Sequence, residues 1–170
     1  MEIKQLHEFK CVREKTLCFS GSRDIPLYLA PKLDTLIYDI MLSLYNRGYK
    51  TFITGGAIGF DTIAAKAVIN FKKHYPDIRT VMMIPYKGHD RRWKDDQRLL
   101  LENLIEETDE VIYIGKEYSQ WIFLRRNDAM VLHSNHLVCF NPPDKTKGGT
   151  AYTIQKAKKE KLIISNIYIS

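Results

Sequence analysis

Short apolar segments alternate with amphipathic helical segments along almost the whole of this 170-residue chain. The apolar segments lie at residues 16–20, 51–54, 80–84, 110–114, 136–140 and 162–164. Helical periodicity fills residues 31–46, 61–73, 95–107, 120–134 and 150–159. Strands that are apolar on both faces are typical of parallel sheets covered by helices. The alternation therefore predicts a doubly wound α/β fold with a mostly parallel sheet and helices on both faces.

The remaining residues, 1–15, are polar and weakly patterned, and we interpret them as an N-terminal leader that packs on the body or is loosely ordered. Residues 16–170 then form one domain, long enough to bury a proper core. No apolar run reaches the ~18–20 residues of a membrane span, so no membrane contact is predicted. Cys11, Cys18 and Cys139 lack metal-site spacing, and no other cluster predicts a metal. Cys18 and Cys139 fall in predicted strands and are interpreted as small buried hydrophobes, which favours a cytoplasmic location.

A glycine-rich turn follows the second apolar segment, in Thr51-Phe-Ile-Thr-Gly-Gly-Ala-Ile-Gly-Phe-Asp61. The first N–H groups of a helix have no intrahelical partner and lie at the positive end of its dipole, so such a turn suits a phosphate. The spacing matches neither the dinucleotide fingerprint nor the P-loop. Two interpretations of Asp61 stay open. It either caps the helix, or it accepts bonds from ribose hydroxyls while phosphate lies along Gly55 and Gly56.

Two similar turns follow the first and fifth apolar segments. In Gly21-Ser-Arg23, backbone N–H groups, a hydroxyl and a guanidinium are available, and the guanidinium can hold a phosphate as a bidentate fork. Lys147-Gly-Gly-Thr150 precedes the last helix, with Thr150 as cap or ligand. Because the carboxyl ends of parallel strands meet at one edge, the three turns together predict a phosphate-bearing ligand of nucleotide size.

Each of two further sequence features has two interpretations that we weigh equally. Trp93 either stacks on a base or covers the core. The polar residues of Arg125-Arg-Asn-Asp128 either join the site or form a solvated helix face. The net charge of +6 admits nucleic acid as a partner, although a solvated basic face is the commoner explanation of such a charge.

From about residue 16 to residue 165 the chain resembles the YpsA-like group of the SLOG superfamily. That superfamily contains Rossmann-like domains related to the LOG hydrolases and to DprA. The matching pieces are Gly21-Ser-Arg23, Gly55-Gly-Ala-Ile-Gly-Phe-Asp61, Pro85 with Trp93, Arg126-Asn-Asp128 and Gly148-Gly-Thr150. The resemblance implies a Rossmann-like fold, a nucleotide-derived ligand related to NAD or ADP-ribose, and self-association as a homodimer or higher homo-oligomer.

The chain departs from the LOG hydrolases in the segment before the last helix. Their Pro-Gly-Gly-x-Gly-Thr-x-x-Glu motif corresponds here to Lys147-Gly-Gly-Thr-Ala-Tyr-Thr-Ile154, and no glutamate falls within residues 150–159. Cleavage of an N-glycosidic bond needs a carboxylate near the ribose, and the candidates are Asp61 and Asp128. Whether the protein is an enzyme therefore stays open.

The leading hypothesis is a sensor or binding module for a nucleotide or nucleotide derivative. The alternatives are a nucleotide N-glycosidic hydrolase and a DprA-like binder of single-stranded DNA, although no row of exposed aromatic residues is evident in the sequence. The predicted ligand-binding residues are Gly21, Ser22, Arg23, Gly55, Gly56, Gly59, Asp61, Trp93, Arg126, Asn127, Gly148, Gly149 and Thr150.

Overall fold

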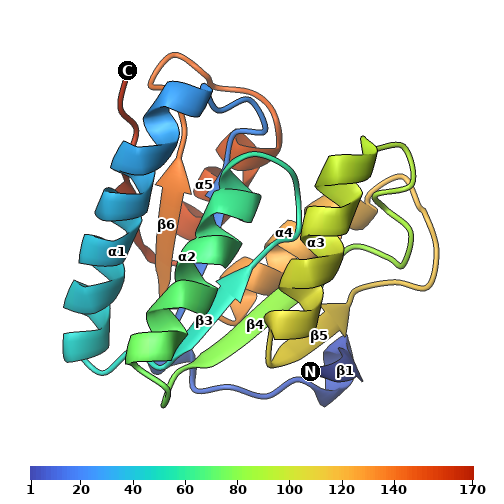
Figure 1. Ribbon diagram of the computed structural model, residues 1–170, viewed down its shortest axis with the longest axis horizontal. Coiled ribbons are helices and arrows are strands. Elements are labelled where there is room, and N and C mark those ends of the chain that lie inside the picture. Colours follow the sequence, from blue (N-terminus) through green and yellow to red (C-terminus); the bar gives the residue numbers. More distant parts are fainter.

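A computed structural model describes residues 1–170 as a seven-stranded sheet with five α-helices (Figure 1). The strands are β1 (Glu2–Gln5), β2 (Thr16–Gly21), β3 (Thr51–Thr54), β4 (Arg79–Ile84), β5 (Glu110–Tyr113), β6 (His136–Phe140) and β7 (Ile163–Asn166). The helices are α1 (Ala30–Asn46), α2 (Phe60–His74), α3 (Asp95–Glu107), α4 (Ile122–Leu132) and α5 (Gly149–Lys159). Every strand pairing is parallel, which confirms the predicted Rossmann-like α/β fold.

The order of the strands across the sheet is β1-β5-β4-β3-β2-β6-β7. From β2 the chain builds outward through β3, β4 and β5, and then returns to place β6 on the other side of β2. The winding therefore reverses between β2 and β6, where Gly21 lies opposite Phe140. In open α/β sheets the ligand crevice lies beyond the carboxyl ends of the strands at such a reversal.

The helices cover the two faces of the sheet in chain order. In Figure 1, α1, α2 and α3 stand in front of the sheet, and α4 and α5 lie behind it. Alternate strand residues supply the two cores: Leu17 and Phe19 pack with α1 and α2, whereas Cys18 and Cys139 pack with α4 and α5. Burial raises the pKa of both thiols to about 12, so the prediction that they are buried hydrophobes is confirmed. No helix has the length and apolar character needed to cross a membrane.

Residues 1–15, which we predicted as a leader, contribute an edge strand to the same sheet. Strand β1 pairs with β5. Between them Glu110, whose side chain is 7% exposed, forms ion pairs with Lys4 at 2.6 Å and with Arg79 at 2.7 Å. A buried carboxylate with two cationic partners is well compensated, so this pair of contacts ties β1 to β4 and β5.

Candidate functional site

A cavity of about 340 Å³ opens beside the carboxyl end of β2, at the reversal of the winding. It gathers eight of the predicted residues, namely Gly21, Ser22, Arg23, Asp61, Arg126, Asn127, Gly149 and Thr150. The other lining residues are Phe19, Ser20, Asp24, Ala57, Phe123, Leu124, Met130 and Lys145. Segments from β2, α2, α4 and α5 thus meet at one place, as expected for the ligand crevice of this fold.

Arg126 is the most deeply buried charged side chain of this cavity, with 5% of its surface exposed. Its Nε donates to Asn127 Oδ1 at 2.8 Å, and its Nη1 donates to the Gly55 carbonyl. Its Nη2 donates no hydrogen bond within the chain, and none of the ion pairs includes this residue. A buried charge is costly unless it is paired, so a guanidinium with a spare donor in a cavity favours an anionic ligand.

Asp61 is the second residue of α2, and it is not the N-cap that we considered, because α2 begins at Phe60 with Gly59 as its N-cap. Its side chain is buried, and Oδ2 accepts the N–H of Ala57 at 3.2 Å. Burial raises the pKa of this carboxyl, while the positive charge of Arg126 opposes the rise. The carboxylate therefore balances part of the charge of the arginine without forming a direct ion pair with it.

Gly55 of the central turn contacts both of these side chains, and neither Gly55 nor Gly56 lines the cavity. The Gly55 carbonyl accepts from Arg126, and the Gly56 carbonyl is hydrogen-bonded to His89 Nε2 at 2.9 Å. A Cβ at Gly55 would stand 2.5 Å from Asp61 Oδ2, inside van der Waals contact. Glycine is therefore required here so that the turn can approach the carboxylate.

Gly59 also lies outside the cavity and joins the turn after β2 to the start of α2. Its φ is +79°, and a Cβ there would lie 2.3 Å from the carbonyl oxygen of Arg23. The Phe60 N–H donates to the carbonyl of Ser22 at 3.0 Å, and the Ser22 N–H donates to Phe140 at 3.1 Å. The Ser22 N–H that we expected to bind phosphate is thus already used, and the Ser22 hydroxyl accepts the N–H of Asp24 at 3.2 Å. Arg23 is therefore the residue of this turn whose side chain stays unpaired on the cavity wall.

The N-terminus of α5 provides backbone donors at another part of the cavity wall. Its N-cap is Gly148, with φ +103°, and no side chain caps the helix, so the interpretation of Thr150 as the cap is wrong. Gly148 itself does not line the cavity, whereas Gly149 and Thr150 do. Asn127 Nδ2 makes no hydrogen bond within the chain, and a Cβ at Gly149 would lie 3.8 Å from it. This wall therefore combines unpaired N–H groups with positive dipole charge.

The two remaining candidates, Trp93 and Asp128, also lie outside the cavity. The ring of Trp93 meets the ring of His89 edge-on at 5.2 Å and packs against the core between α2 and α3. Asp128 accepts a hydrogen bond from the hydroxyl of Tyr152 at 2.8 Å, outside the cavity. Of the two candidate catalytic carboxylates, only Asp61 lies in the cavity.

The apolar wall contributed by α4 was missed at the level of sequence. Phe123, Leu124 and Met130 line the cavity together with Arg126 and Asn127. Residues 123, 126, 127 and 130 lie on one face of the helix, because side chains three and four positions apart are neighbours there. A polar pair at 126 and 127 between apolar residues on that face is the sequence signal that could have predicted this wall.

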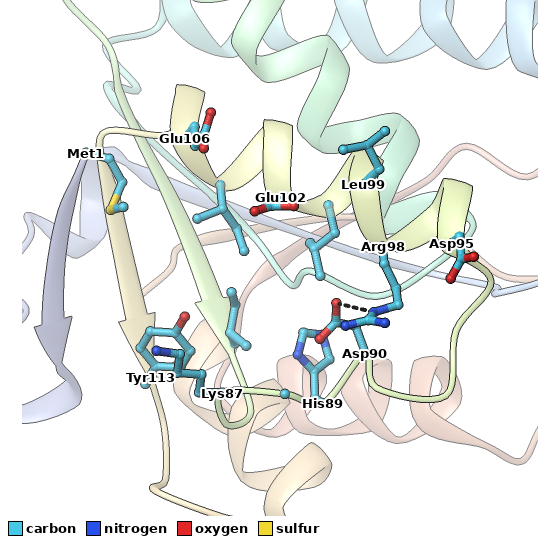
Figure 2. A pocket seen from close by; sticks show the side chains of 14 residues that line it. Met1, Lys87, His89, Asp90, Asp95, Arg98, Leu99, Glu102, Glu106 and Tyr113 are labelled. Carbon is cyan, nitrogen blue, oxygen red and sulfur yellow. Dashed lines mark ion pairs between the residues drawn. The ribbon is translucent and has the colours of Figure 1, made fainter.

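A second cavity of about 560 Å³ lies between α3 and the ends of β4 and β5 (Figure 2). Glu102 and Glu106 enter it from α3, and Asp90 forms an ion pair with Arg98 at 3.7 Å. Carboxylates outnumber cations in this lining, so a phosphate is disfavoured there. Nowhere in the chain do three or more His, Cys, Asp or Glu side chains form a group that could hold a metal ion.

Comparison with protein families and curated proteins gives a consistent set of relatives. A family model described as the YspA SLOG family matches residues 28–167. The SPbeta prophage-derived protein YoqJ of Bacillus subtilis is 32% identical over 120 residues, which cover 64% of this chain and 69% of YoqJ. The UPF0398 protein YpsA of Bacillus subtilis is 22% identical over 156 residues, which cover 86% of each chain.

Among solved structures, DNA processing protein A (DprA) from Streptococcus pneumoniae matches with a TM-score of 0.64 and 18% identity, over 89% of this chain and 49% of that one. DprA from Helicobacter pylori matches with a TM-score of 0.60 and 18% identity, over 88% of this chain and 63% of that one. The chain thus spans about half of the first protein and less than two thirds of the second. At this identity the likeness shows a shared fold.

Proposed function

The chain belongs to the YspA SLOG family, and from that premise we propose that it binds a phosphate-bearing nucleotide or nucleotide derivative as a sensor or binding module. The single observation that carries the proposal is Arg126, a buried guanidinium with a spare donor and no ion pair in the cavity beside β2. Phosphate is a common biological anion that accepts charge-assisted hydrogen bonds from such a donor.

The other lining residues support an anion at the same place. Arg23 is exposed at the cavity wall and takes part in no hydrogen bond or ion pair, so its charge is available to a ligand. Asn127 Nδ2 and the first N–H groups of α5 add neutral donors around Gly149. A volume of about 340 Å³ lies near the lower limit of small-molecule sites and suits one nucleotide unit. NAD or ADP-ribose would then place its second half outside the cavity.

A thermal-shift screen tests this function directly. The panel contains NAD, ADP-ribose, nucleoside mono-, di- and triphosphates, inorganic phosphate and short single-stranded DNA. A ligand at 100 times its dissociation constant stabilises the native state by about 2.7 kcal/mol, so we expect a clear rise in the midpoint for one nucleotide class. Release of free base from that nucleotide then reports hydrolysis. No shift with any nucleotide would contradict the proposal.

Single-stranded DNA is the second candidate ligand. The DprA structure from Helicobacter pylori is described for its single-stranded DNA binding mode, and it shares the fold of this chain. The phosphates of such a strand can occupy the same donors, with Lys145 at the cavity wall as a further cation. A shift with DNA and with no mononucleotide would favour this candidate over the first.

A further inference from the structure

The lining of the cavity beside β2 mixes two kinds of surface. Arg23, Asn127 and the start of α5 supply polar groups, whereas Phe123, Leu124 and Met130 of α4 supply apolar surface beside them. An inorganic anion would use only the polar groups and would leave the apolar side chains facing water. The lining therefore fits a ligand that carries both an anionic group and a flat apolar ring.

Phe123 belongs to a row of aromatic side chains that continues out of the cavity. Its ring centroid lies 6.2 Å from that of Tyr86, and Tyr86 lies 6.2 Å from Tyr118. The interplanar angles are 76° and 77°, so the rings meet edge to face. Tyr118 is 64% exposed, and Phe123 is half-buried. Tyr86 at this angle covers at most one face of the Phe123 ring, and Phe123 also lines the cavity.

We propose that Phe123, held in place by Tyr86, is the stacking face for the base of the bound nucleotide. This inference rests on the proposed function, because the phosphate held by Arg126 fixes the other end of the ligand. Tyr118 extends the aromatic row to solvent and offers a second face to a longer ligand. Phe123 has Leu124 and Met130 as companions on this wall, and these side chains offer no hydrogen-bond donor to the base edge. Recognition by stacking alone tolerates every base, because every base has a π-face.

Adenosine 5′-monophosphate and ribose 5-phosphate form the probe pair, because the first carries a base and the second does not. Calorimetric titrations of the full chain compare the wild type with Phe123→Leu, which keeps an apolar side chain and removes the ring. Tyr38→Leu is the control, since Tyr38 is an exposed ring outside the cavity that meets Phe71 of the other core edge-on. Circular dichroism and the melting midpoint establish that each variant is folded.

We expect the wild type to bind adenosine 5′-monophosphate at least about tenfold more tightly than ribose 5-phosphate, as one base stack provides. Phe123→Leu should remove most of that advantage and leave the affinity for ribose 5-phosphate unchanged, while Tyr38→Leu changes neither. Guanosine and cytidine monophosphates should bind comparably. Tyr118→Ala, at an exposed position, should weaken a dinucleotide more than a mononucleotide.

Three results would overturn the stacking face: equal wild-type affinities for the two probes, an equal loss for both probes in Phe123→Leu, or no loss in that variant. In each of these cases ribose 5-phosphate still binds, so the phosphate site of the proposed function survives. Absence of binding by both probes would instead remove the phosphate site, and the stacking face with it.

Discussion

Arg126 and Asp61 are two opposite charges that share a buried site without direct contact. Burial lowers the pKa of the guanidinium and raises the pKa of the carboxyl, and the field of each partner opposes the shift of the other. Each side chain instead bonds to the glycine turn, through Gly55 and Ala57 respectively. The remaining donor of Arg126 and the remaining acceptor of Asp61 therefore have a fixed orientation before a ligand binds.

Arg23 tests the anion site without disturbing the core, because its side chain is exposed and unpaired. Arg23→Ala should lower nucleotide affinity at least about tenfold, since a hydrogen bond to a charged group contributes roughly 1.5–3 kcal/mol. The melting midpoint without ligand should not change. Arg92→Ala removes the same charge from an exposed position outside the cavity and should leave the affinity as in the wild type. Equal affinities in all three proteins would remove Arg23 from the site.

Asp61 gives a pH signature. Burial raises the pKa of its carboxyl above the ordinary value of 3.8. The protonated carboxyl therefore makes its full contribution to the stability of the folded state below that pH, and this contribution is lost as the pH rises through the raised pKa. Asp61→Asn does not titrate. The free energy of unfolding of this variant, relative to the wild type, should therefore increase from about pH 4 towards neutral pH. Denaturant titrations at several pH values measure the difference; a constant or falling difference would contradict the buried, unpaired carboxyl.

The individual elements show where sequence reasoning succeeded and where it failed. The apolar periodicity over residues 31–46 and 61–73 predicted α1 and α2 to within one residue at each end. Strand β1 was missed because Glu2-Ile-Lys-Gln5 has no apolar run, and its pairing with β5 depends on contacts more than one hundred residues away. The turn glycines were recognised, but their role was not, because the group bonded to Gly55 lies 71 residues further along the chain.

The turn between β3 and α2 should be far less tolerant of a methyl group than the start of α5. Gly55→Ala places a Cβ against the carboxylate of Asp61 and should lower the free energy of unfolding by about 1–3 kcal/mol, as overpacking does. Gly149→Ala has its nearest atom at 3.8 Å and is the matched control, with little change expected. Chemical denaturation compares the two; a neutral Gly55→Ala would contradict the packing described for this turn.

The topology of the whole molecule explains why residues so far apart in sequence form one cavity. Strand alternation predicted a parallel sheet but not its order, because the inner strands β2 to β6 are buried on both faces and each can pair with several neighbours. The observed order places the reversal between β2 and β6, and so brings the turn after β2 next to α5. The sequence therefore predicted which turns lie at the carboxyl edge of the sheet, and only the fold shows that Gly55, Gly56, Gly59 and Gly148 do not line the cavity.

The basic charge of the whole chain provides a test between its two candidate ligands. DNA binding that neutralises several phosphates falls steeply with salt, whereas a mononucleotide releases few counterions. We expect nucleotide affinity to change little between about 50 and 200 mM salt, measured by titration at each concentration. A single-stranded oligonucleotide that binds more tightly than any mononucleotide, with a steep salt dependence, would favour the DNA-binding function.

The most direct test of the central claim is a calorimetric titration of adenosine 5′-diphosphate into the wild type and into Arg126→Met. Methionine keeps an apolar chain in the buried position and removes the charge, and such replacements are often tolerated. We predict saturable binding to the wild type and an affinity at least about tenfold lower in the folded variant. Equal affinity in the two proteins would show that the buried arginine does not hold the ligand, and would contradict the assignment of this cavity as the nucleotide site.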